Sequence, residues 1–129
     1  MADIFSILTY DVDKNSGLTM TDTYQDVANV TMAAPTVVNG WYEFGMSITS
    51  TFDTTTKSEF YRFSLDGGTS WNEFTHEPSD QTDEEPFVYI FPKQYTSAEA
   101  VNFIVQARKE DTAGTMLVPF ADAWIKRVN

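Results

Sequence analysis

The chain has one histidine, His76, and this residue is where acid–base chemistry would first be sought. It stands beside Glu73 and Glu77, so an imidazole and two carboxylates occur within one short polar stretch. A hydrolase also needs a nucleophile and a group that orients the base, which a lone histidine among carboxylates does not supply. We therefore expect His76 to be a solvated loop residue, and we assign no catalytic residue.

A second group of carboxylates follows: Asp80, Asp83, Glu84 and Glu85. Such a group could in principle form a glycosidase pair or a metal site. Neighbouring like charges in one loop more often repel one another and stay hydrated, and prolines at both ends disfavour helix and strand. The sequence therefore predicts a long exposed acidic loop over residues 73–85, with no metal and no cofactor.

Oxygen-bearing side chains near the N-terminus resemble the spacing of a calcium loop. Asp11, Asp13, Asn15 and Asp22 fall near its positions 1, 3, 5 and 12. The place that needs glycine for the sharp bend is occupied by Ser16, and an aspartate replaces the usual glutamate at the last position. We favour a polar turn with Gly17 at positive φ.

Size and charge restrict the protein class. The chain has 129 residues, no cysteine and a net charge of −11, with eight Lys and Arg residues. A single domain over residues 1–129 is expected, with residues 1–20 a candidate arm that contacts neighbours. So few cations argue against binding to nucleic acid or to an anionic membrane. The N-terminus lacks the features of a signal peptide, so a product assembled in the cytoplasm is expected.

The elements that must position these residues are strands. Tyr42, Phe44, Met46 and Ile48 alternate with polar or small residues, which is typical of a strand with one buried face. About eight such runs occur at the spacing of sandwiches. The sequence therefore predicts an all-β antiparallel β-sandwich, either immunoglobulin-like or jelly-roll.

Three finer expectations accompany this fold. In the simplest topology the run 60–65 pairs with the run 42–52. Residues 97–100 form a single helical turn. Pro119 marks an edge strand or a β-bulge in the last run, because proline lacks the N–H that a sheet ladder needs.

A hairpin is predicted in the middle of the chain. The aromatic run 60–65 leads into Asp66-Gly67-Gly68 and emerges at Trp71, and glycine accepts positive φ without a Cβ clash. We expect serine and aspartate oxygens to bond back to turn amides and the indole to pack beneath the hairpin in the core. The structural residues assigned to this hairpin are Ser64, Asp66, Gly67, Gly68 and Trp71.

The stretch from Ser64 to Trp71 resembles the Asp-box of sialidase-type propellers and many other β proteins. Ser64, Asp66, Gly68 and Trp71 match the motif, and Ser70 replaces threonine. Propellers repeat the motif in every blade, whereas this chain has it once. The resemblance therefore implies a structural hairpin and no glycosidase activity.

A wider stretch resembles small virion structural proteins of tailed phages. The resemblance rests on the hairpin at 63–71, on Glu77-Pro78-Ser79-Asp80, and on Arg127-Val128 near the C-terminus. It implies a capsid decoration protein bound to the major capsid protein, often as a trimer, or else a neck, tail or fibre component. In that setting both ends of the chain should be ordered by other chains, and candidate partner contacts are Phe5, Ile7, Lys126 and Arg127.

A carbohydrate-binding sandwich is the rival interpretation. Small sandwiches bind sugars on exposed rings, and Trp41, Tyr42, Trp71 and Trp124 are available. Two coplanar exposed rings on one sheet face would favour this interpretation, and fully buried rings would favour a core role.

Overall fold

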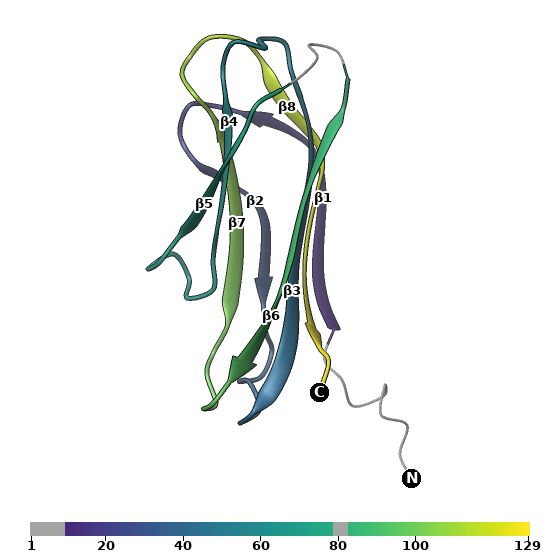
Figure 1. Cartoon of the computed structure of the whole chain (residues 1–129), viewed down its shortest axis with the longest axis vertical. Coiled ribbons are helices and arrows are strands. Elements are labelled where there is room, and N and C mark those ends of the chain that lie inside the picture. The colour runs from purple at the N-terminus through teal and green to yellow at the C-terminus, as the bar shows by residue number, and fades with distance from the viewer. Residues whose placement is uncertain (1–9, 79–82) are drawn as a thin grey trace.

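The computed structural model describes residues 10–78 and 83–129, and in these ranges the chain forms eight strands in two antiparallel four-stranded sheets (Figure 1). The strands are β1 (Tyr10–Met20), β2 (Gln25–Thr31), β3 (Gly40–Phe52), β4 (Glu59–Ser64), β5 (Asn72–His76), β6 (Glu85–Tyr95), β7 (Asn102–Lys109) and β8 (Met116–Arg127). The all-β sandwich predicted from the sequence is thus confirmed. Within the same ranges, no helix has the length and hydropathy needed to cross a bilayer.

The strand order distinguishes between the two sandwich types that the sequence left open. One sheet has the order β1-β8-β3-β6 and the other β2-β7-β4-β5. Among the described strands, every connection passes from one sheet to the other except the β4–β5 hairpin. This order is that of a jelly roll. The expected pairing of run 60–65 with run 42–52 is wrong, because β3 lies between β8 and β6 while β4 belongs to the opposite sheet.

The core lies between the sheets and follows the period of two along β3. Tyr42, Phe44, Met46 and Ile48 are each at most 1% exposed, as the alternating pattern predicts. The facing side chains of β8 include two alanines, Ala121 and Ala123, which leave room for these large residues. Large side chains on one strand are thereby matched by small ones on its neighbour, the condition for dense packing.

Aromatic rings close the core beneath the two edge strands β5 and β6. Phe74 of β5 lies 4.8 Å from Tyr89 and 5.3 Å from Phe87 of β6, measured between ring centroids. Phe63 of β4 lies 5.0 Å from Phe91 of β6. Offset ring contacts of this kind stabilise beyond the area they bury. They hold the two sheets together along the side where β5 and β6 share no hydrogen-bonded ladder.

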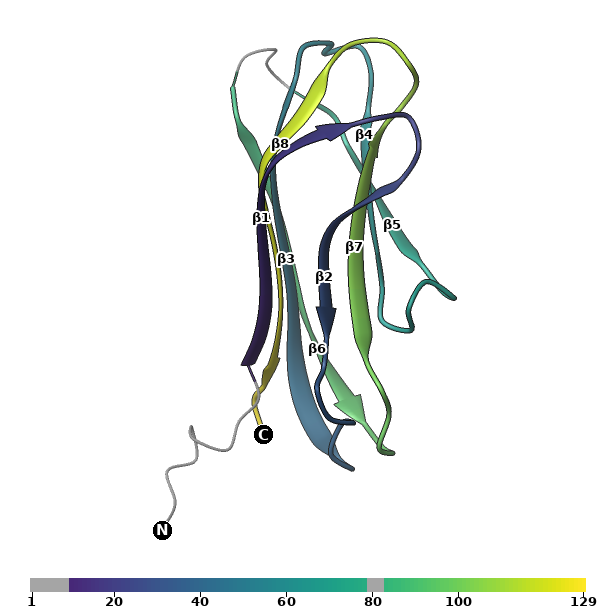
Figure 2. The ribbon, with the colours of Figure 1, turned by 180° about the vertical axis from the view of Figure 1, so that it is seen from behind.

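Strand β8 shows how the sheet accommodates Pro119. The pairing of β8 with β3 shifts by one residue between Thr49 and Thr51, opposite Pro119, which is a β-bulge. Gly17 of β1, at φ 70°, faces the same point. The expected bulge is therefore confirmed, whereas the expected edge position is wrong because β8 lies between β1 and β3. β1 begins and β8 ends at the same end of the sandwich (Figure 2).

Two local expectations fail. Residues 97–100 form a bend followed by irregular chain instead of a helical turn, and Thr36 makes hydrogen bonds there with Glu99 and Ser97. The acidic loop is shorter than predicted, because β5 extends to His76 and β6 begins at Glu85. The side chains of His76 and Glu85, at these strand ends, are mostly buried and do not extend into solvent.

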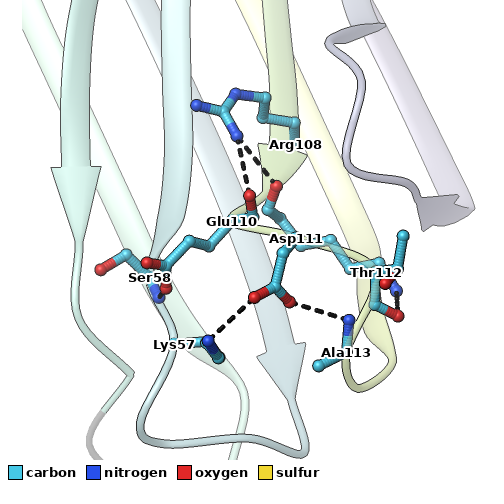
Figure 3. A network of polar contacts seen from close by, with 8 residues as sticks. Lys57, Ser58, Arg108, Glu110, Asp111, Thr112 and Ala113 are labelled. Carbon is cyan, nitrogen blue, oxygen red and sulfur yellow. Dashed lines mark hydrogen bonds and ion pairs between the residues drawn. The ribbon is translucent and has the colours of Figure 1, made fainter.

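A polar network fastens the loop before β4 to the loop after β7 (Figure 3). Lys57 Nζ lies 2.8 Å from Asp111 Oδ2, and Glu110 Oε2 accepts a hydrogen bond from the Ser58 amide at 2.9 Å. Arg108 donates to the backbone carbonyl of Glu110. The Lys57 ammonium beside Asp111 lowers the pKa of that carboxyl below its usual value. This end of the sandwich is thus closed by polar contacts.

Candidate functional site

The β4–β5 turn is built around two side-chain oxygens. Ser64 Oγ donates to Asp66 Oδ1 at 2.7 Å and accepts the Gly68 amide at 2.9 Å. Asp66 Oδ1 also accepts the amides of Thr69 at 3.0 Å and Ser70 at 2.9 Å. These hydrogen bonds, with the one from Ser64 as the largest cause, lower the pKa of Asp66 to about 2. The turn is therefore held in one shape by its own ionised carboxylate.

Both glycines of this turn have positive φ, 71° at Gly67 and 101° at Gly68. The turn is also tied to β7, because Asn102 accepts the Gly67 amide and donates its own amide to Leu65. The serine, aspartate and glycines assigned from the sequence thus lie together in one hydrogen-bonded turn. Their assignment came from side-chain types that are known to bond back to turn amides.

Trp71 does not lie in the core. It is half-buried on the outer face of the sheet β2-β7-β4-β5, where the Arg62 guanidinium carbon lies 3.9 Å from its ring centroid. The same guanidinium carbon lies 3.9 Å from the Tyr24 ring centroid, and the Arg108 guanidinium carbon lies 5.1 Å from that centroid. Cations therefore stack on these rings.

A polar row crosses the same face in register. Gln106 donates to Asp26 at 2.7 Å, Arg62 donates to Gln106 at 2.8 Å, and an Arg62 nitrogen lies 3.8 Å from Glu73. These four residues pair across the strands β2, β7, β4 and β5. We call this set the outer polar row. Its polar groups are paired with one another, so the face needs no further partner to satisfy them.

The outer face of the other sheet differs. One row in register runs Val12, Trp124, Gly45 and Ile90, across all four strands. The Trp124 indole lies across Gly45, where an added Cβ would come within 2.0 Å of it, and donates to Glu43 at 3.0 Å. Glycine at this position is what allows the indole to lie flat on the sheet.

Further large apolar side chains lie on the same face, interspersed with polar ones such as Lys14 and Asp122. Phe120 is 57% exposed, Val88 is 54% and Ile90 is 50%. We call the whole surface the outer apolar face, and it comprises Val12, Val88, Ile90, Leu117, Phe120 and Trp124. Exposed apolar surface gathered on one face of a soluble domain is a feature of interaction sites.

His76 is not a solvated loop residue, so that expectation is wrong. It ends β5 and points between the sheets, with Nδ1 2.8 Å from Glu59 Oε1 and Nε2 3.2 Å from Glu85 Oε2. Glu59 is only 1% exposed, and its ring-facing oxygen is matched by the imidazole. Both ring nitrogens can donate only in the imidazolium form. The contact therefore links three strands, β4, β5 and β6.

The calcium-loop pattern lies on a strand. Residues 11–20 belong to β1, so Asp11, Asp13 and Asn15 alternate along extended chain instead of wrapping round an ion. Asp13 accepts from Asn15 at 2.8 Å and from the Asn29 amide at 2.8 Å. In residues 10–78 and 83–129, no group of three or more His, Asp or Glu side chains is arranged to hold a metal ion.

The residues expected to contact partners lie in different places. Phe5 and Ile7 fall outside the described residues. Lys126 is exposed on β8 opposite Glu43, and Arg127 donates to the Asn129 carbonyl at 3.1 Å. Within the chain, most of the C-terminal segment belongs to β8, which pairs with β1 on one side and with β3 on the other.

The four rings considered for sugar binding are dispersed. Tyr42 is in the core at 1% exposure, and Trp41 is 38% exposed. Trp71 and Trp124 lie on the outer faces of opposite sheets. The feature that would have favoured sugar binding, a coplanar exposed pair, is not found among these four rings.

Comparison with known proteins identifies a fold. No family profile matches the sequence, and no curated protein resembles it. The infectious bursal disease virus VP2 subviral particle is similar in structure, with a TM-score of 0.57 at 7% identity, covering 98% of this chain and 39% of VP2. The chain thus spans well under half of that protein. At this identity the likeness shows a shared jelly-roll architecture alone.

Carbohydrate-binding proteins also match, less closely. One is the module pair of Clostridium thermocellum xylanase 10B crystallised with xylohexaose, with a TM-score of 0.45, 12% identity, and 97% of this chain and 27% of that one covered. Another is a family 16 carbohydrate-binding module, with a TM-score of 0.39, 11% identity, and coverage of 82% and 70%.

Proposed function

We propose that this protein is a non-enzymatic structural component of a tailed-phage particle, a decoration protein that binds the major capsid protein through its outer apolar face. The observation that carries the proposal is the contrast between the two outer faces. One carries the outer polar row, whose groups are paired among themselves. The other exposes Phe120, Val88 and Ile90 to solvent.

Burial of such side chains against a partner contributes roughly 25 cal/mol for each Å² of apolar surface removed from water. The face lies on long strands, and β8 and β3 are each paired on both sides, which restricts the motion of the backbone. A rigid surface loses little conformational freedom on binding, which favours a stable attachment.

Two of the four sheet edges, β5 and β6, are poorly suited to the addition of a strand from a partner. Edge strand β6 contains Pro86 and Pro92, which have no N–H to offer to an added strand. The edge strand β5 is only five residues long. The hairpin and the acidic segment resemble those of phage virion proteins, and this resemblance suggests a capsid shell as the partner. It also suggests that the protein binds the shell as a trimer.

The absence of an evident catalytic arrangement in the described ranges fits a structural role. The one histidine is held by Glu59 and Glu85, and the Ser50 hydroxyl is paired with that of Tyr61 at 2.9 Å inside the core. A nucleophile must reach its substrate, and a buried serine cannot do so.

The test is co-sedimentation of the purified protein with emptied shells of the parent phage. We expect saturable binding, weakened at least about tenfold by Ile90→Glu, which places a charge in the outer apolar face. The matched control is Thr75→Glu, which places the same charge at an exposed strand position of the opposite sheet and should leave binding unchanged. Equal effects of the two variants would contradict the proposal. A ring in solution that ignores shells would instead indicate a neck or tail component.

A further inference from the structure

A groove of about 280 Å³ opens between the β4–β5 turn and the last third of β6. It exists because β5 begins only at Asn72, opposite Phe63, so no strand of that sheet covers the end of β6. The residues that line it are Leu65, Asp66, Ser70, Asn72, Lys93, Tyr95, Glu99 and Ala100. Its volume is close to the lower end of the range for small-molecule sites.

The walls of the groove are held in place without a ligand. Asp66 fixes the turn on one side through three hydrogen bonds to its Oδ1. On the other side Tyr95 is 4% exposed and packs edge-on against Tyr42, with ring centroids 5.6 Å apart. A site that is already rigid does not lose binding free energy to ordering.

One polar group that lines the groove is available to hydrogen-bond a ligand. The Tyr95 hydroxyl has no hydrogen-bond partner among the described residues, although the side chain is almost completely buried. Asp66, on the opposite wall, is exposed to solvent. Burial, and after it the nearby Glu99 carboxylate, raise the pKa of Tyr95 to about 12, so the hydroxyl keeps its proton and can donate it. The hydroxyl faces the groove and is open to water there, and a ligand group that takes the place of this water can make the same hydrogen bond.

The hydrogen-bond donors and acceptors that line the groove indicate which class of ligand would fit it. Asp66 and Glu99 only accept hydrogen bonds, the Lys93 ammonium only donates them, and Asn72 and Ser70 do both. A matching ligand must therefore donate and accept over a small area, which hydroxyl groups on a compact ring do. Two carboxylates disfavour an anion, and the ammonium disfavours a cation. Leu65 and Ala100 add apolar surface suited to the C–H face of such a ring.

We infer that this groove binds a neutral sugar, with Tyr95 and Asn72 as its hydrogen-bonding residues. The site is separate from the outer apolar face, so the protein can hold a sugar while its sheet face is covered. It is also separate from the four rings considered above, because none of them lines the groove.

The experiment is an NMR titration of the ¹⁵N-labelled protein with glucose, galactose, mannose and N-acetylglucosamine, each added alone. We expect saturable shift changes for at least one sugar, confined to the amides of the groove. Tyr95→Phe removes only the hydroxyl and should weaken binding about tenfold, since each 1.4 kcal/mol is a factor of ten. Asn72→Ala, at an exposed position, should weaken it to a similar extent.

Tyr89→Phe is the matched control. Tyr89 is on the same strand, is 37% exposed and does not line the groove, so its variant should bind as the unaltered protein does. The inference is overturned if none of the four sugars shifts the groove amides, if the shifts map to another surface, or if Tyr95→Phe and Asn72→Ala both bind normally. Each of these results is independent of whether the protein attaches to shells.

Discussion

Nδ1 of His76 lies 2.8 Å from Oε1 of Glu59, and this contact joins the end of β5 to the start of β4 inside the sandwich. Glu59 is 1% exposed, so its carboxyl group is removed from water, and the imidazole is the partner of its Oε1. The other ring nitrogen faces Glu85 of β6, in the opposite sheet. One histidine therefore fastens both sheets at the side that no backbone ladder closes.

Removal of the imidazole should destabilise the fold strongly. His76→Ala leaves the Glu59 carboxylate buried without its partner, and breaking a buried pair in this way costs about 3–5 kcal/mol. Urea denaturation at neutral pH measures the loss in the free energy of unfolding. Adding Glu59→Gln to His76→Ala should recover part of it, because the buried charge is then gone. Thr75→Ala, at the preceding exposed position, is the control. A loss below about 1 kcal/mol for His76→Ala would show that the pair is not needed.

Gly45 should not tolerate a side chain. The Cβ of Gly45→Ala would lie 2.0 Å from two atoms of the Trp124 ring, so the indole must leave its place and its hydrogen bond to Glu43. We expect a loss of about 1–3 kcal/mol, the usual cost of overpacking, and a red shift of tryptophan fluorescence as the ring enters water. Ser47→Ala, on the same face of β3, is the control and should leave the emission unchanged. An unshifted spectrum for Gly45→Ala would contradict this packing.

Trp71→Ala should cost less than a core aromatic. The ring is half-buried and stacked on Arg62 outside the sheet, and stacking of this kind is worth about 0.5–2 kcal/mol. Phe103→Ala, in the fully buried core, should cost about 3–5 kcal/mol. Thermal or urea unfolding of the two variants compares them directly. Equal losses would return Trp71 to the core, where the sequence alone had placed it.

The Asp66 turn should lose stability in acid. The pKa of this carboxyl is about 2 in the folded protein, below its ordinary value of 3.8, so its stabilisation is fully present above about pH 4 and is lost as pH falls towards 2. Asp66→Asn should therefore be less stable than the unaltered protein at neutral pH, and the difference should shrink over that window. Asp22→Asn, at an exposed position, should show no such trend. A difference that stays constant from pH 7 to pH 2 would contradict the role of the ionised carboxylate.

Local patterns predicted the elements of this fold well. The alternation from Tyr42 to Ile48 depends only on which face of one strand is buried, and the Asp66-Gly67-Gly68 turn depends only on backbone conformation. Both are encoded within a few residues, so both could be read from the sequence. The β4–β5 pair was predictable for a further reason: it is the one described connection that stays within a sheet.

Pairing between distant strands could not be predicted in this way. The simplest topology placed β4 beside β3, whereas a jelly roll sends it to the other sheet, and nothing local to either strand distinguishes the two arrangements. The groove has the same origin, since Asp66, Asn72, Lys93 and Glu99 come together only through that topology.

One feature of the sequence does indicate that His76 lies inside the sandwich. Glu59 is in phase with Tyr61 and Phe63, the buried residues of β4, so a carboxylate was already placed on the core face of a strand. A buried carboxylate needs a partner, and the chain offers a single histidine to provide it. The identity of that partner still required the register of β4 against β5.

The most direct test of the central claim is electron cryomicroscopy of emptied shells of the parent phage incubated with the purified protein. We predict added density at symmetric positions on the shell surface, fitted by the sandwich with β1, β8, β3 and β6 against the shell and with Phe120 and Ile90 in the contact. Shells without added density, or sandwiches attached through the outer polar row, would contradict the claim.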